Sequence, residues 1–168
     1  GISQYGLAKQ IMVSNNEAEE FLHSYFLKFP EIKEYMKSTV SFCRKSGYVN
    51  NIFGRRCHIT GINDKNYNVR NFQERAAINA PIQGSASEVM RLAMIRLNKR
   101  FNDLKNSTSK ILLQIHDELI FEVPNDEVKS ISKIIKDEMS SVKNSDLHSF
   151  SIPLTVDVNI GDNWGILH

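Results

Sequence analysis

The stretch LLQIHDELIFEV, residues 112–123, decides the fold of this 168-residue chain. Two short runs rich in Leu, Ile, Phe and Val stand on either side of three adjacent ionisable residues, His116, Asp117 and Glu118. Apolar runs of this length and composition favour buried strands over helices. The polar triplet between them is too short to form a loop with a core of its own. We therefore predict a tight β-hairpin with the triplet at its tip.

This tip allows two interpretations. A polar hairpin tip is most often a solvated turn. The alternative is a rigid mount for catalytic carboxylates, because two buried strands hold the tip in place. A carboxylate there can bind Mg²⁺, which prefers oxygen ligands. Adjacent strand residues point to opposite faces, so we expect Asp117 to bind the metal and Glu118 to occupy an auxiliary position.

Helices are predicted for most of the first 47 residues. Residues 3–12 form a short helix, and residues 30–47 form a longer one that begins with a proline and ends with a glycine. Between them, the sequence SNNE at residues 14–17 is a capping box. Apolar residues follow it at helical spacing, and we assign their aromatic stripe to the core: Phe21, Tyr25 and Phe29.

Residues 48–59 are predicted to form two short strands, or an extended hairpin, around Gly54. Arg55 and Arg56 lie at its turn. Arginines in a turn are ordinarily exposed to solvent and have no further role. The alternative is contact with a phosphate, which arginine side chains commonly make in nucleic-acid complexes.

A further helix runs from Val69 toward Pro81. Three polar residues on it are spaced four apart and would share a face if the helix continued: Arg75, Asn79 and Gln83. Amide side chains can donate to purine N3 and pyrimidine O2 in the minor groove, and an arginine can hold a phosphate. A polar network at a helix end is the other interpretation. We expect the helix to end or kink at Pro81, and a second capping box at residues 85–88 to start a new helix.

After the hairpin, Asn125 is the predicted cap of a helix with one apolar face: Val128, Ile131, Ile135, Met139 and Val142. Residues 143–151 are predicted as a loop. Apolar and polar residues then alternate from Leu154 to Ile160, which indicates a half-buried strand beside the hairpin. Helices followed by a hairpin, a helix and a strand define an α+β fold.

Charge, hydrophobic runs and cysteine spacing limit the kinds of protein and the compartments that fit this chain. The net charge of +2 conceals a basic first hundred residues and an acidic remainder, a division compatible with a bound polyanion and bound cations. No run of eighteen apolar residues and no secretory leader are present in the sequence, so we predict no membrane span. Cys43 and Cys57 have neither zinc-site nor redox spacing, which favours a reducing compartment. The chain opens without Met, and we expect a piece of a longer protein.

Four segments together resemble the C-terminal end of the bacterial family A DNA polymerases: GYVNNIFGRR (47–56), RAAINAPIQGSASEVMRLAM (75–94), QIHDELIFEV (114–123) and IPLTVDVNIGDNW (152–164). The resemblance covers nearly the whole chain in unbroken order. It implies the remaining fingers helices and hairpin in residues 1–68, and part of a palm in residues 69–168, with a catalytic hairpin in an antiparallel sheet.

The resemblance also implies roles for single residues. Asp117 falls on the aspartate that binds the catalytic metals, with Glu118 beside it contributing less directly. His116 falls on a histidine near the primer terminus. Arg75, Asn79 and Gln83 fall on positions that line the DNA groove near the terminal base pair.

The implied reaction is template-directed DNA synthesis, for replication and repair, with two Mg²⁺ ions at the palm. The partners are primer–template DNA and dNTP substrates, with no membrane and no obligate protein partner. The compartment is the bacterial cytoplasm, in association with the nucleoid, or a DNA-containing organelle of a eukaryote. The family's first metal-binding motif lies upstream of these segments and is absent, so we expect the isolated chain to be inactive.

Two rival functions remain open at this stage. The first is a nucleic-acid-binding module without catalysis, which would bind primer–template DNA in a salt-sensitive way. The second is a metal-dependent nuclease or phosphatase built on Asp117 and Glu118. It would need further carboxylates, for which Asp157 and Asp162 are the candidates, although both have the pattern of structural residues.

Overall fold

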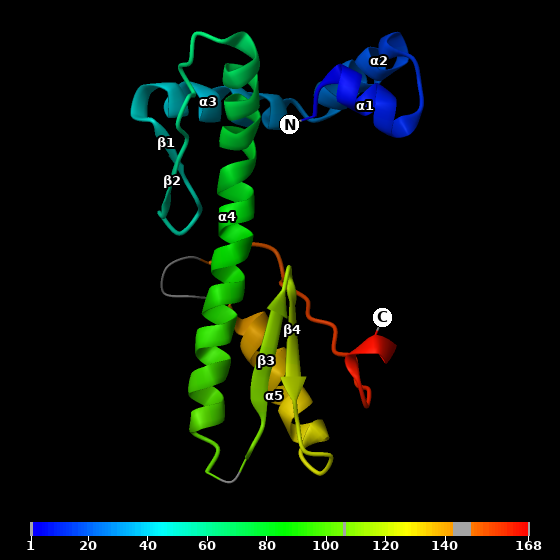
Figure 1. Cartoon of the computed structure of the whole chain (residues 1–168), viewed down its shortest axis with the longest axis vertical. Coiled ribbons are helices and arrows are strands. Elements are labelled where there is room, and N and C mark those ends of the chain that lie inside the picture. Colours follow the sequence, from blue (N-terminus) through cyan, green and yellow to red (C-terminus); the bar gives the residue numbers. More distant parts are fainter. Residues whose placement is uncertain (1, 106, 143–148, 168) are drawn as a thin grey trace. The chain divides into compact units, whose positions relative to one another are not determined.

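The computed structural model describes residues 2–105, 107–142 and 149–167. The chain divides into two compact units, Gly1–Gly84 and Ser85–His168, and helix α4 (Tyr67–Asn102) contributes to both. Helices accompany two small antiparallel sheets, which confirms the α+β class (Figure 1). The assignment of residues 1–68 to fingers and 69–168 to palm is a different division of the chain and stays a prediction. Most of the predicted loop 143–151 lies outside the described residues.

The first unit begins with three helices, as predicted: α1 (Gln4–Ile11), α2 (Asn15–Lys28) and α3 (Pro30–Ser46). The capping box at the start of α2 is confirmed. Ser14 Oγ accepts a hydrogen bond from the backbone N–H of Glu17 at 3.2 Å, and the Glu17 carboxylate accepts from the N–H of Ser14 at 2.9 Å. These bonds stabilise the ionised form and hold the pKa of Glu17 below its usual range.

The aromatic stripe of α2 is not core, and that prediction is wrong. Phe21, Tyr25 and Phe29 are 57%, 38% and 41% exposed. Ala18 is the buried residue of α2, where the helix meets its neighbours. Helical spacing shows which residues share a face, but burial of that face needs a covering element. The rings of Tyr25 and Phe29 lie with centroids 5.1 Å apart, and Tyr25 also meets Phe26 of the same helix at 5.5 Å.

The predicted hairpin at residues 48–59 is confirmed as β1 (Tyr48–Asn50) paired with β2 (Arg56–His58). Gly54 lies in its turn with φ +82°, a left-handed conformation that glycine adopts without steric cost. The hairpin packs with α3 and α4 around a core of five buried residues: Cys43, Val49, Ile59, Ile62 and Ala77. Both cysteines are free thiols, and burial raises the pKa of Cys43.

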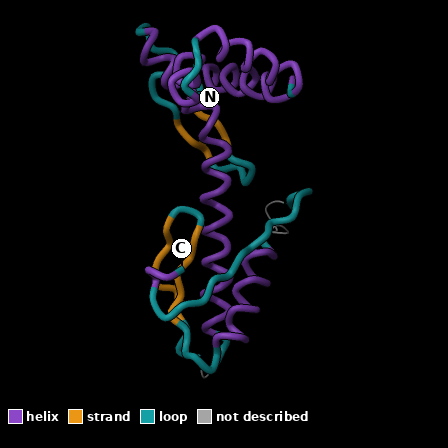
Figure 2. Tube along the Cα trace, turned by 90° about the vertical axis from the view of Figure 1, so that its right-hand side faces the viewer, coloured by secondary structure: helices purple, strands orange, loops and turns teal. Residues whose placement is uncertain are grey.

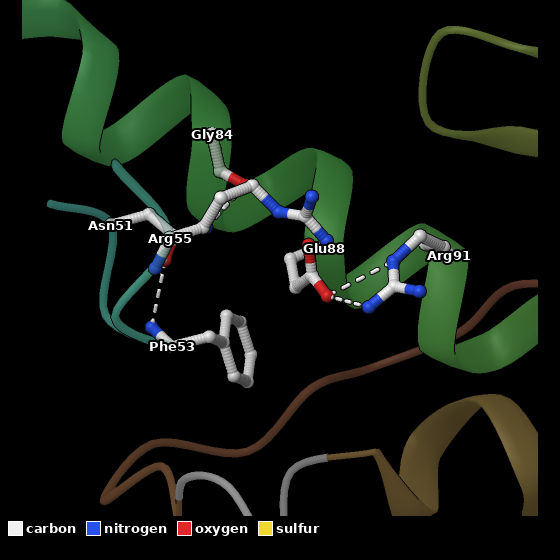
Figure 3. A network of polar contacts seen from close by, with 6 residues as sticks. All are labelled: Asn51, Phe53, Arg55, Gly84, Glu88 and Arg91. Carbon is white, nitrogen blue, oxygen red and sulfur yellow. Dashed lines mark hydrogen bonds and ion pairs between the residues drawn. The ribbon is translucent and has the colours of Figure 1, made fainter. Parts of the chain in front are cut away.

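Helix α4 passes through Pro81 without ending, so the predicted break is wrong. A proline inside a helix loses one hydrogen bond and costs about 3 kcal/mol, which tertiary contacts can offset. The predicted second capping box is wrong as well. Ser85 is buried within the helix, and the Glu88 carboxylate accepts a hydrogen bond from Arg91 Nε at 2.9 Å instead of capping a new helix (Figure 3).

The second unit contains the central hairpin, formed by β3 (Lys110–Ile115) and β4 (Glu118–Glu122), which confirms the predicted hairpin. The predicted burial of its strands is wrong: no residue of either strand is fully buried, and Leu112 and Leu113 are 46% and 49% exposed, because only one face of the hairpin packs on the helices. Helix α5 (Val128–Ser141) follows. The core is made by α4, α5 and the inner face of the hairpin: Leu97, Phe101, Ile131 and Ile135, with Ile111, Leu119 and Phe121 packed on them. The two strands are therefore anchored on two helices, as Figures 1 and 2 show.

The start of α5 differs from the prediction. Its N-cap is Glu127, not Asn125. The Glu127 carboxylate accepts hydrogen bonds from the hydroxyls of Ser107 and Ser109, the latter at 2.9 Å. The connector before β3 therefore holds the first turn of α5. Sequence spacing could not show this, because the serines lie about twenty residues away.

The predicted strand at 154–160 is not formed, and its residues are drawn as loop in Figure 2. The alternation is present as far as Val158, because Leu154, Val156 and Val158 are half-buried while the residues between them are exposed, but Ile160 is 67% exposed. An extended segment becomes a strand only when a neighbour supplies a ladder of hydrogen bonds. The described residues supply no such ladder to this segment. The chain then reaches a short 3₁₀ helix, η1 (Trp164–Ile166).

Candidate active site

The hairpin tip is a two-residue turn made by His116 and Asp117. Ile115 and Glu118 are the last paired residues of the two strands. His116 has φ +52°, a left-handed conformation in which a side chain other than glycine costs about 1–2 kcal/mol. Gln114 Nε2 donates a 2.6 Å hydrogen bond to the carbonyl of His116 and closes the turn from one strand. His116, Asp117 and Glu118 are all exposed.

The tip carries oxygen donors of the kind that a magnesium site uses. Asp117 supplies carboxylate oxygens, which are the ligands that Mg²⁺ prefers, and Glu118 is its neighbour at the start of β4. No cluster of three or more His, Cys, Asp or Glu side chains suited to a metal occurs among the residues that the structure describes. The donors present therefore fit one side of a metal site, not a complete one. Asp157 and Asp162 are not gathered with Asp117 into such a cluster.

The predicted groove residues lie together on α4 in the first unit. Because α4 continues through Pro81, Arg75, Asn79 and Gln83 follow one another at a spacing of four within a single helix. Gln83 is exposed, whereas Arg75 and Asn79 are half-buried. The condition for their sharing a face, a continuous helix, is met.

Two other side chains of the first unit bond to this part of α4, and both were missed in the sequence. Tyr35 Oη donates to the carbonyl of Ile78 at 3.0 Å. Asn51 Nδ2 donates to the carbonyl of Gly84 at 3.2 Å (Figure 3). The sequence gives no signal for the Tyr35 bond, because Tyr35 lies among apolar residues of α3 at helical spacing. The available signal for Asn51 was the tendency of asparagine before a glycine turn to hydrogen-bond the backbone nearby.

Asn51 also builds the turn of the β1–β2 hairpin. Its Oδ1 accepts hydrogen bonds from the backbone N–H of Phe53 at 3.0 Å and of Arg55 at 2.9 Å. The side chain is 4% exposed, so its three polar contacts are made away from water. Arg56, at the start of β2, stacks its guanidinium 4.7 Å from the centroid of the Tyr48 ring.

The structure thus brings the predicted site residues together in two groups. His116, Asp117 and Glu118 form the tip of the hairpin in the second unit. Arg75, Asn79 and Gln83 form a row on α4 in the first unit. A positively charged turn at Arg55 and Arg56 accompanies the second group.

The structure thus has a row of amide and arginine side chains on α4 and a hairpin whose tip presents carboxylates. The chain belongs to DNA polymerase family A, whose family model matches residues 1–166. It is 43% identical to the DNA polymerase I of Caldicellulosiruptor bescii over 164 residues, which are 98% of this chain and 19% of that protein. It is 41% identical to the DNA polymerase I of Lactococcus lactis subsp. cremoris, covering 98% of this chain and 18% of that protein.

The fold matches a solved structure, the POL domain of Pol1 from M. smegmatis in complex with DNA primer–template and dNTP. The TM-score is 0.90 and the identity 36%, over 99% of this chain and 28% of that one. The chain spans less than a fifth of the length of the curated relatives named above. In the part of the chain that the structure describes, no helix has the length and apolar character needed to cross a membrane.

Proposed function

We propose that the longer protein containing this chain carries out template-directed DNA synthesis. In this reaction a primer 3′-hydroxyl attacks the α-phosphate of a dNTP, forms a phosphodiester bond and releases pyrophosphate. Family membership and the names of the bacterial relatives support the proposal. So does the M. smegmatis structure, which is a complex with a DNA primer–template and a dNTP. In a bacterium the protein would act in the cytoplasm, on the nucleoid.

The observation that carries this proposal is the strained turn that presents Asp117. A non-glycine residue in a left-handed conformation persists only where its surroundings impose it, and such positions concentrate at functional sites. The turn holds the Asp117 carboxylate exposed, on strands anchored in the core. We assign Asp117 as a ligand of catalytic Mg²⁺, with Glu118 assisting. The ions would supply charge that neutralises the reacting phosphates.

The row on α4 is proposed to contact the primer–template near its terminal base pair. Asn79 and Gln83 carry amide donors that suit the minor-groove acceptors common to all base pairs. Such contacts sense the shape of a pair more than its sequence. Arg75 carries a guanidinium that suits a phosphate, and His116 is assigned to the primer terminus. Under this proposal residues 1–68 belong to the fingers and 69–168 to the palm.

We also propose that the 168-residue chain by itself binds DNA without extending primers. The absence of a three-ligand cluster in its described residues supports this, because a two-ion site needs carboxylates from more than one segment. As an isolated piece the chain would then act as a binding module, with affinity that falls steeply with salt.

The test is primer extension by the longer protein with Mg²⁺, comparing wild type, Asp117→Ala and Asp126→Ala. Asp126 is the matched control, because it is an exposed acidic residue at the other end of the hairpin. We expect Asp117→Ala to lower the extension rate roughly a thousandfold or more, since a catalytic metal contributes several kcal/mol. Its melting temperature should change little, and Asp126→Ala should extend normally. Equal extension by all three proteins would remove Asp117 from the metal site.

A further inference from the structure

Asn79 and Gln83 lie on the part of α4 that contains Pro81. Because of this proline, that part lacks one backbone hydrogen bond of a regular helix. Proline has no N–H to donate to the carbonyl of residue 77, and its ring crowds the preceding turn. Proline positions are where helices kink. The two amide side chains proposed to meet base edges therefore stand beside the proline inside a helix that is 36 residues long.

Two hydrogen bonds from outside the helix flank this turn. The carbonyl of Ile78, which receives the Tyr35 hydroxyl at 3.0 Å, immediately precedes Asn79. The carbonyl of Gly84, which receives the Asn51 amide at 3.2 Å, immediately follows Gln83. The donors come from different elements, α3 and the β1–β2 turn. Tyr35 is half-buried and Asn51 is buried, so both bonds are partly removed from water.

We propose that Tyr35 and Asn51 are positioning residues that fix the orientation of Asn79 and Gln83 toward the primer–template. This inference rests on the proposed function, because it gives Tyr35 and Asn51 a role in discriminating matched from mismatched terminal base pairs. Neither side chain contacts the DNA in this proposal. Each acts through the backbone of α4, on one side of Pro81.

The geometry also explains why Asn51 suits its position. Its Oδ1 organises the turn by accepting from Phe53 and Arg55, while its Nδ2 reaches the helix. One side chain thus fastens the turn with Arg55 to the end of the Asn79–Gln83 segment (Figure 3). At the contact point α4 has a glycine. A Cβ built on Gly84 would meet the Cys57 Sγ at 3.4 Å and the Asn51 Cβ at 3.5 Å, which places hairpin and helix in direct contact.

The test uses Tyr35→Phe in the longer protein, which removes one hydroxyl and keeps the ring. The matched control is Tyr5→Phe, because Tyr5 is 70% exposed on α1. The readout is the ratio of extension rates from matched and mismatched primer ends, with the primer–template Kd and the melting temperature measured beside it. We expect Tyr35→Phe to lower the ratio about two- to tenfold, the range for loss of one hydrogen bond. The Kd should stay within about twofold of wild type, and Tyr5→Phe should match wild type throughout.

A double-mutant cycle with Gln83→Ala decides whether Tyr35 acts through the helix face. Gln83→Ala alone should slow extension and lower the ratio more than it weakens binding. If Tyr35 positions Gln83, then Tyr35→Phe should have little further effect in the Gln83→Ala background. Two outcomes would overturn the inference while leaving the proposed function intact. In one, the effects of Tyr35→Phe and Gln83→Ala on the mismatch ratio multiply in the double variant. In the other, Tyr35→Phe alone leaves that ratio unchanged. Failure of the wild-type protein to extend any primer would overturn both.

Asn51→Asp provides a second variant, which tests the hydrogen bond from Asn51 to Gly84. It keeps the acceptor for Phe53 and Arg55 but replaces the donor to Gly84 with an oxygen that repels the carbonyl. We expect a larger fall in the mismatch ratio than with Tyr35→Phe, together with a lower melting temperature, because the carboxylate is buried. A fall in melting temperature with an unchanged mismatch ratio would show a structural role alone and count against the inference.

Discussion

The two β-hairpins of this molecule reach their turns by different means. The β1–β2 turn contains Gly54 at positive φ and is organised from within by the buried amide of Asn51, which is also bonded to α4. The β3–β4 turn is shorter, places His116 at positive φ and leaves its polar side chains exposed. The first turn presents arginines and the second presents carboxylates.

The two turns are held in place by different contacts. A buried side chain supports the β1–β2 turn, so its shape depends on one residue. The strands and the core beneath them support the β3–β4 turn, so its shape depends on the ladder from Ile111 to Phe121. We therefore expect a single substitution in the β1–β2 turn to lower the free energy of unfolding. A substitution in the β3–β4 turn should instead change the rate of primer extension by the longer protein.

The largest effect on stability is expected for Asn51→Ala. It leaves the backbone N–H groups of Phe53 and Arg55 and the carbonyl of Gly84 without the amide that now pairs with them. We expect a loss of about 2–4 kcal/mol in the free energy of unfolding, since the variant loses three partly buried hydrogen bonds and each contributes about 0.5–1.5 kcal/mol. Denaturant unfolding measures it. Asn50→Ala is the control, because Asn50 is the exposed last residue of β1, directly before Asn51, and it should stay within about 0.5 kcal/mol of wild type.

A smaller effect of opposite sign is expected for His116→Gly. Glycine removes the steric cost of the left-handed conformation, about 1–2 kcal/mol, and adds chain entropy to the unfolded state of about 0.5–1 kcal/mol. We expect a net gain of up to about 1 kcal/mol in thermal or denaturant unfolding, together with slower primer extension in the longer protein. A loss of stability would mean that the His116 side chain supports the turn, and would weaken the contrast between the two hairpins.

The smallest effect is expected for Gly84→Ala, at the point where the β1–β2 hairpin meets α4. The added Cβ would make ordinary van der Waals contacts with Cys57 and Asn51. Alanine in a helix interior is about 1 kcal/mol more favourable than glycine, so the free energy of unfolding should rise by up to that amount. A clear fall would show that the hairpin and the helix need a closer approach than the one seen, and that the Asn51 bond depends on it.

Much of the fold follows from local patterns. The capping box at Ser14 and Glu17, the hairpin around Gly54 and the apolar face of α5 at Ile131 and Ile135 are all present as predicted. The carboxylates of the central hairpin lie at its tip for the same reason: apolar runs on both sides leave the polar triplet no other place. Their role in metal binding, and that of the α4 row in DNA binding, remain proposals.

Other features could not be predicted from spacing. Phe21, Tyr25 and Phe29 repeat like a core stripe but are exposed, because coverage depends on elements far away in the chain. The alternation at 154–160 lacks a ladder for a similar reason. Asn51 and Tyr35 were missed because each bonds to a carbonyl more than thirty residues away.

The sequence by itself determined the central hairpin with its polar triplet at the tip, the capped start of α2 and the class of fold, because those properties arise among residues within a turn or two of each other. Only the tertiary structure decided that α4 passes through Pro81 as one helix. A proline costs a helix about 3 kcal/mol locally. Whether the helix survives depends on packing at Ala77 and on hydrogen bonds from Tyr35 and Asn51, which come from other elements.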